Sequence, residues 1–196
     1  MLGMDATILF RIPALLLTIT VHEYAHGAMS ASLGDPTPEM DGRLTMNPLA
    51  HLDLVGSLML LLVGFGWAKP VRIDPRYYAN PRSGQLKVAF AGPGSNLFLC
   101  FVAMALQFLM VRFMNPGSGV MLFLNWLMMY NVWFAFFNLI PIPPLDGSKV
   151  VAYFLPMNAA LRYLSVERYG FVILLALLFT GLLGQVLGLL SLLGIL

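Results

Sequence analysis

The sequence predicts an all-α polytopic membrane protein with about four transmembrane helices, a re-entrant or interfacial segment and short strand elements. Hydrophobic residues make up 59% of its 196 residues and charged residues only 10%, whereas a soluble domain carries about 25% charged residues. The mean hydropathy is +0.82, and the apolar residues gather in runs long enough to cross a bilayer. The net charge of +2 is too small to indicate a nucleic-acid partner.

Five apolar segments follow one another, at about residues 6–33, 51–66, 86–114, 119–140 and 169–196. The first segment ends at Gly34, which is followed by turn-forming residues. The second contains three glycines within 16 residues, which favours a re-entrant or interfacial segment over a full span. Since no repeat or flexible linker divides the chain, we expect residues 1–196 to form a single membrane-embedded domain.

Two polar loops flank the second apolar segment. In the first loop, residues 42–47 show a weak strand pattern. The second loop, at about residues 67–87, contains Asp74 and five basic residues: Lys69, Arg72, Arg76, Arg82 and Lys87. Cytoplasmic loops of membrane proteins carry an excess of Lys and Arg, so we expect this loop to be cytoplasmic.

The first apolar segment contains the pentapeptide His22-Glu23-Tyr24-Ala25-His26. An ionisable residue at membrane depth costs roughly 2.5 kcal/mol or more, so this motif indicates a function. On a helix, His22 and His26 share a face and both imidazoles can reach one zinc ion. Glu23 is then placed to polarise a water molecule. The alternative interpretation is a pair of core histidines in a helix bundle.

Two histidines leave a catalytic zinc site one protein ligand short. Asp146 is a candidate for that ligand, because it follows the fourth apolar segment and three nearby prolines force non-helical backbone at membrane depth. Such backbone is tolerated where it is buried in protein or lines a cavity. Gly147 permits close approach. The alternative is a turn aspartate in a Pro-Gly-rich loop, and His51 is either a further ligand, a gate or an interfacial loop histidine.

Three motifs together resemble the site-2 protease family of intramembrane zinc metalloproteases. They are residues 22–26, the stretch from Asn138 to Leu145-Asp146-Gly147, and Ala91-Gly92-Pro93-Gly94-Ser95-Asn96. The resemblance covers about residues 7–156. It implies that His22, His26 and Asp146 bind zinc and that Glu23 is the general base and proton shuttle. Asn138 and Asn96 resemble the family's polar residues that hold the substrate backbone or the oxyanion; otherwise they cap or bridge helices.

The resemblance implies a zinc-dependent endopeptidase that hydrolyses peptide bonds in or near transmembrane segments. Its cofactor is then Zn²⁺, its substrate a membrane protein or peptide, and its surroundings the lipid bilayer of a prokaryotic plasma membrane. The chain is expected to be a single protease domain without the PDZ or CBS domain of larger members. A non-proteolytic membrane metal-binding or metal-transport protein is the alternative, and it has no need of Glu23.

The chemistry also constrains the topology. Glu23 lies 11 residues before Gly34, about 16 Å along a helix at ~1.5 Å per residue. Asp146 reaches that depth from the same side only if the first and fourth segments run in the same direction. Residues 51–66 then do not span, the N-terminus is external, and the active site lies nearer the cytoplasmic face. We further expect residues 42–47 to offer a strand edge near the active site to an unwound substrate.

Overall fold

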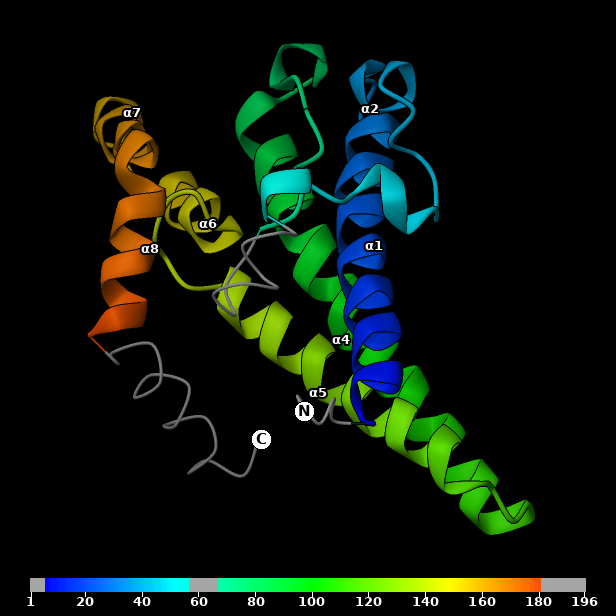
Figure 1. The fold of residues 1–196 in the computed structure, drawn as a ribbon. Helices are drawn as coiled ribbons and strands as arrows, with labels where there is room; N and C mark the ends of the chain where they lie inside the picture. Colours follow the sequence, from blue (N-terminus) through cyan, green and yellow to red (C-terminus); the bar gives the residue numbers. More distant parts are fainter. Residues whose placement is uncertain (1–5, 57–66, 181–196) are drawn as a thin grey trace. The chain divides into compact units, whose positions relative to one another are not determined.

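The computed structural model describes residues 6–56 and 67–180, which are mainly helical (Figure 1). Three helices in this part of the chain are long and apolar enough to cross a membrane: α1 (Ile8–Ser32), α4 (Pro81–Phe113) and α5 (Ser118–Asn138). They correspond to the predicted first, third and fourth apolar segments. The helical, membrane-type fold class is therefore confirmed at this level. The chain divides into two compact units, Met1–Ala135 and Phe136–Leu196, which are described separately.

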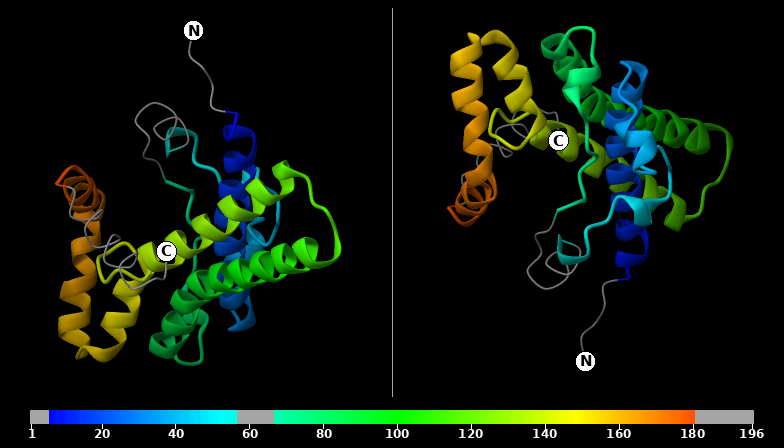
Figure 2. Two further views of the ribbon diagram at one scale, coloured as in Figure 1. Left: turned by 90° about the horizontal axis from the view of Figure 1, so that it is seen from below. Right: turned by 90° about the horizontal axis from the view of Figure 1, so that it is seen from above.

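In the first unit, α1 and α4 pack against each other, and they cross in both views of Figure 2. Small side chains permit this close packing, because Ala14 of α1 and Ala103 of α4 are 0% and 1% exposed. Leu124 and Leu127 of α5 complete the buried cluster. The core of this unit thus lies where α1, α4 and α5 meet.

Helix boundaries in the first unit follow from local chemistry. Pro81 begins α4, where its missing N–H costs no hydrogen bond. The Asn80 side chain caps this helix by accepting a hydrogen bond from Ser83 N over 3.1 Å. After α1, Gly34 adopts a positive φ of 101°, as glycine readily does. The expected helix stop at Gly34 is therefore present.

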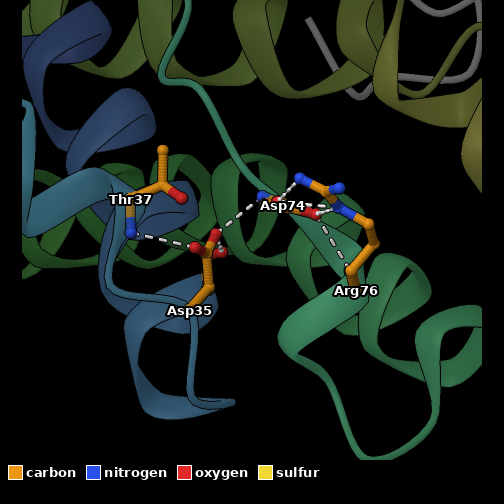
Figure 3. Close-up of polar contacts among 5 residues, drawn as sticks. Asp35, Thr37, Asp74 and Arg76 are labelled. Atoms are coloured by element: carbon orange, nitrogen blue, oxygen red, sulfur yellow. Dashed lines mark hydrogen bonds and ion pairs between the residues drawn. The ribbon is translucent and has the colours of Figure 1, made fainter.

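Asp35 joins the end of α1 to two loops (Figure 3). This carboxylate is 1% exposed. It accepts hydrogen bonds from Ser30 Oγ and Asp74 N, each over 2.7 Å, and from Thr37 N over 2.9 Å. Thr37 opens the short helix α2 (Thr37–Met40), and Asp74 precedes the 3₁₀ turn η2 (Pro75–Tyr77). One buried acid thus holds the loops on both sides of the second apolar segment.

The expected strand at residues 42–47 is wrong, because this segment forms turns and bends. Gly42 has φ of +65° and ends a turn, and a 3₁₀ turn, η1 (Pro48–Ala50), follows closely. The loop is held by side chains instead, since the ring of His51 bonds to Thr45 O over 2.8 Å. Within residues 6–56 and 67–180, β pairing is limited to an isolated antiparallel bridge between Leu52 and Ala68.

Two topological expectations extend beyond the described residues. Most of the second apolar segment, residues 57–66, lies outside them, so its re-entrant nature stays a prediction. The expected fourth span begins with α8 (Gly170–Phe179), but residues 181–196 again lie outside the described part. The prediction of four spans is therefore not confirmed, and three candidate spans are present in the described chain.

The second unit contains three further helical elements before α8. They are α6 (Asp146–Phe154), α7 (Met157–Leu164) and the 3₁₀ turn η3 (Ser165–Tyr169). No helix was expected between the fourth and fifth apolar segments, because helices of 9 and 8 residues are shorter than the roughly 11-residue window over which a helical period is recognised. The proline stretch is held inside this unit, since Tyr163 OH donates to Pro141 O over 2.6 Å.

Candidate active site

Two histidines on successive turns of α1 face each other. The ring centroids of His22 and His26 lie 4.5 Å apart with the rings nearly perpendicular, and their Nε2 atoms are 2.9 Å apart. His22 is 3% exposed, and the ring of Phe134 packs edge-on against it at a centroid distance of 4.8 Å. The structure therefore brings together the two histidines that the sequence motif singled out.

The other ring nitrogen of each histidine is bonded to an oxygen. His26 Nδ1 lies 2.8 Å from Val88 O, and His22 Nδ1 lies 2.7 Å from Asn96 Oδ1. A carbonyl oxygen only accepts hydrogen bonds, so the hydrogen of each neutral imidazole is on Nδ1. The two Nε2 atoms that face each other thus carry lone pairs, which is the arrangement that metal-binding histidines show.

Gly92 of α4 lies directly against this pair of nitrogens. A Cβ atom at this position would lie 2.7 Å from His22 Nε2 and closer still to His26 Nε2. Real Cβ atoms essentially never come this close to other atoms. The backbone of α4 can therefore approach the two Nε2 atoms this closely only because residue 92 has no side chain.

Glu23 lies on the next position of α1 and is 9% exposed. Its Oε2 accepts a hydrogen bond from the backbone N–H of Val71 over 3.0 Å. The carboxylate is therefore fixed by a loop outside its own helix. Gly27, one turn further along α1, lies tightly against Leu44, because a Cβ there would lie 3.0 Å from Leu44 Cδ2, whereas Val71 Cγ1 would be at the ordinary contact distance of 3.5 Å.

Residues 67–73 form the loop segment that carries Val71, and several contacts hold it in place. Lys69 N donates to His51 O over 2.9 Å, and the Arg43 guanidinium donates to Lys69 O. Arg72 pairs with Asp41. The backbone donor for Glu23 thus belongs to a loop segment that several contacts hold in place.

His51 is fully buried, and its ring lies against Thr45 O and Arg43 rather than the histidine pair.

Asn96 is fully buried on α4, one turn after Gly92. Its Oδ1 accepts from His22 Nδ1, and its Nδ2 donates to Thr18 O over 3.0 Å and to Asn131 Oδ1 over 2.8 Å. Its polar atoms are therefore directed at the protein itself. The substrate or oxyanion role expected for Asn96 stays a prediction, and the structure adds a contact to a predicted ligand.

Asp146 and Asn138 belong to the second unit, where Asp146 begins α6 and Asn138 ends α5; both are half-buried. The turn between them is tight, because a Cβ on Gly147 would lie 2.5 Å from Leu139 C and 2.6 Å from Ile140 O. Gly147 is therefore required for the backbone to pass residues 139 and 140. The ligand role of Asp146 and the polar role of Asn138 remain predictions.

Sequence reasoning missed three contributors to this site. Val71 acts through its backbone N–H, which no side-chain pattern reveals. Gly92 was recognised only as part of a small-residue motif. Asn131 was overlooked, although a polar residue inside an apolar helix is itself a signal.

Comparisons with known proteins give a consistent result. Residues 110–181 match the model of Peptidase family M50. The protein named "Putative zinc metalloprotease YwhC" of Bacillus subtilis is 36% identical over 173 residues, covering 86% of this chain and 79% of the relative. A similarly named relative, Rip2 of Mycolicibacterium smegmatis, is 29% identical over 84% of this chain and 64% of the relative. No solved structure matches the chain.

A helical membrane-type fold that carries this paired-histidine motif defines a class of membrane metallopeptidases. The chain belongs to peptidase family M50, the site-2 protease family. It is a metalloendopeptidase of that family.

Proposed function

We propose that this protein is a zinc-dependent intramembrane endopeptidase that hydrolyses peptide bonds in or near transmembrane segments of membrane-protein substrates. One observation carries the proposal: the two Nε2 atoms of His22 and His26 face each other at 2.9 Å while both Nδ1 atoms bond to oxygen. Two imidazole nitrogens that converge at this distance, with their hydrogens on the opposite ring positions, are suited to bind one cation together. The motif that provides them lies inside a candidate membrane span.

The residues present suit zinc. Zinc binds imidazole nitrogen at about 2.0–2.1 Å in tetrahedral geometry, which separates two ligand nitrogens by roughly 3.3 Å. The observed 2.9 Å is close to that separation. Gly92 brings no side chain against either nitrogen, whereas any Cβ at this position would meet both. The curated relatives carry zinc metalloprotease names, which agrees with this donor set.

His22, His26 and Asp146 are the proposed protein ligands. Catalytic zinc sites commonly use three protein ligands and keep one open position. The described part of the second unit contains two acidic residues, Asp146 and Glu167. Glu167 is exposed, so Asp146 is the candidate ligand from this unit. It also lies within residues 110–181, which match the family model.

Glu23 is the proposed general base. Bound zinc acts as a Lewis acid and lowers the pKa of water towards about 7. Glu23 accepts the proton from the attacking water and passes it to the leaving amine. Val71 N–H donates to Oε2 and so fixes the orientation of the carboxylate that transfers the proton. Asn138 is retained as a candidate substrate contact.

The position of Glu23 along α1 and the basic loop indicate the depth and the side of the proposed site in the membrane. Glu23 lies nine residues before the end of α1 at Ser32, about 14 Å along the helix at ~1.5 Å per residue. Lys69 and the basic residues that follow it support a cytoplasmic position for the nearer end. We therefore place the site within the plasma membrane of a prokaryote, nearer its cytoplasmic face.

The decisive experiment compares the purified wild type with Glu23→Gln. Bound zinc and cleavage of a transmembrane model peptide are both measured, and Glu39→Gln, at an exposed position of α2, is the matched control. Retained zinc with lost cleavage in Glu23→Gln, and full activity in Glu39→Gln, supports the proposal. A wild type that binds zinc, transports it and cleaves nothing would instead support a metal carrier.

A further inference from the structure

Three buried polar side chains from three helices connect to the ring of His22. Asn131 of α5, Asn96 of α4 and Thr18 of α1 are each 0% exposed. Asn131 Nδ2 donates to Thr18 Oγ1 over 2.9 Å, and Asn96 Nδ2 donates to Asn131 Oδ1 over 2.8 Å. Asn96 Oδ1 accepts from His22 Nδ1 over 2.7 Å. These bonds form one continuous network that ends on a proposed zinc ligand.

Backbone carbonyl groups fix the direction of every hydrogen bond in this network. Asn131 Nδ2 also lies 2.8 Å from Leu127 O, and Asn96 Nδ2 lies 3.0 Å from Thr18 O. A carbonyl oxygen cannot donate, so each amide must turn its NH₂ group towards it. Thr18 Oγ1 donates to Ala14 O over 2.8 Å and can therefore only accept from Asn131. One orientation of both amides satisfies all these partners.

That orientation leaves Asn96 with an acceptor facing His22. The hydrogen of a neutral His22 ring must then lie on Nδ1. The competing tautomer, with its hydrogen on Nε2, would let His22 donate to His26 Nε2 across 2.9 Å and would occupy the lone pairs of both ligands. Turning Asn96 to suit that tautomer would place its oxygen against Thr18 O and Asn131 Oδ1. In a buried site, this loses two hydrogen bonds without replacement.

We propose that the Thr18–Asn131–Asn96 network is a positioning device that keeps the Nε2 lone pair of His22 available for zinc by preventing a hydrogen bond between His22 and His26. Asn131 is its key residue, because it connects α5 to both other helices and does not touch the histidine itself. The inference rests on the proposed function, since it takes His22 as a zinc ligand.

The test measures zinc affinity by chelator competition on the purified, full-length protein in detergent. Asn131→Leu removes the acceptor for Asn96, and we expect its zinc affinity to fall by about 10-fold or more. Asn131→Asp keeps an acceptor oxygen facing Asn96 but loses the NH₂ donor to Leu127 O and Thr18 Oγ1, so we expect its zinc affinity to lie above that of Asn131→Leu and below that of the wild type. Thr18→Val removes one partner of Asn131, and we expect a smaller loss, roughly 2- to 10-fold.

Two control variants match these changes. Thr20 is also buried on α1 at 1% exposure and bonds to Leu16 O over 2.7 Å, outside the network. Asn125 pairs with Gln107 over 3.0 Å between the same two helices, α4 and α5, at an exposed position. We expect Thr20→Val and Asn125→Leu to bind zinc as the wild type does.

A second readout follows the histidine tautomer in the zinc-free protein. The sequence contains three histidines, so ¹⁵N-labelled rings give few signals. We expect wild-type His22 to carry its hydrogen on Nδ1 and Asn131→Leu to show an increased Nε2–H population. If Asn131→Leu does not fold, Thr18→Val and Asn131→Asp carry the same comparison.

The outcomes separate the two proposals. Unchanged zinc affinity and an unchanged tautomer in Asn131→Leu would overturn the network inference alone. So would equal losses in Thr18→Val and Thr20→Val, because these indicate a general packing effect. A wild type that binds no zinc would overturn the proposed function, whereas the tautomer spectra would still report on the orientation that the network imposes.

Discussion

The backbone N–H of Val71 donates a hydrogen bond to Glu23 Oε2 over 3.0 Å, although 48 positions separate the two residues. The proposed general base is therefore oriented by a loop segment and not by its own helix. Because a backbone group provides this contact, substitutions that preserve the N–H preserve the hydrogen bond.

Val71→Pro removes that donor and tests its importance. We expect kcat to fall by roughly 10- to 100-fold, since a hydrogen bond to a charged group contributes roughly 1.5–3 kcal/mol, while zinc content stays unchanged. Val71→Ala keeps the N–H and is the control, with kcat expected near the wild-type value. Peptide cleavage and metal content are measured on the same preparations. Equal kcat in the two variants would show that the hydrogen bond does not assist Glu23.

Gly92→Ala fills the space beside the histidine pair. Its Cβ would lie 2.7 Å from His22 Nε2, so the rings or α4 must move, and we expect zinc affinity to fall by about 100-fold, the upper range for disturbed ligand positioning. Gly94→Ala lies on the same helix with nothing within 4 Å of the added carbon. We expect it to bind zinc normally and to be as stable or more so, by up to about 1 kcal/mol. Zinc titration of both variants provides the comparison, and normal affinity in Gly92→Ala would contradict the proposed metal position.

Asp35 makes the stability of the first unit depend on pH. Burial by itself raises the pKa of this carboxyl group. Hydrogen bonds from Thr37, the Asp74 backbone and Ser30 outweigh that effect, and the pKa of Asp35 lies below its usual value of 3.8. A lowered folded-state pKa stabilises the fold fully above about pH 5, and this stabilisation is lost as the pH falls through the folded-state pKa.

Asp35→Asn is therefore expected to lower the free energy of unfolding by about 1–3 kcal/mol at neutral pH. The difference from the wild type should shrink as the pH falls below about 4. Unfolding in detergent is followed at several pH values for both proteins. A constant difference across this range would show that the ionised form of Asp35 is not what stabilises the loops.

Asp146→Ala tests the proposed third ligand. We expect zinc affinity to fall by more than the roughly 10- to 100-fold that loss of an outer partner costs, and cleavage to be lost at low zinc. Glu167→Ala, at an exposed acidic position of the same unit, is the control. Extraction with a chelator should release zinc from Asp146→Ala at lower chelator concentration than from the control. Equal release would exclude Asp146 as a ligand.

Features that depend only on residues close together in the sequence were predicted correctly. His22 and His26 share a face because four positions make about one helical turn, and α1 ends where Gly34 permits a positive φ. The apolar segments at 86–114 and 119–140 correspond to α4 and α5, because length and hydropathy suffice to identify membrane helices.

Features that depend on contacts between distant residues were not predictable in this way. Residues 42–47 were expected to form a strand, but side-chain bonds from Arg43 and His51 hold the loops instead. Asn131 contributes through partners on two other helices. Hydropathy patterns predict which residues are buried, but they do not predict which buried polar groups form hydrogen bonds with one another.

One turn of α4 contacts both nitrogens of a single imidazole. Gly92 lies against Nε2 of His22, and Asn96, four positions later, bonds to Nδ1 of the same ring. A glycine followed at that spacing by an asparagine therefore forms a physical counterpart to the histidine motif on α1. The two motifs form the two sides of one proposed zinc site. A chain that kept the histidines but carried a larger residue in place of this glycine would have the sequence appearance of a metallopeptidase, with a side chain forced against the two nitrogens that are proposed to bind its metal.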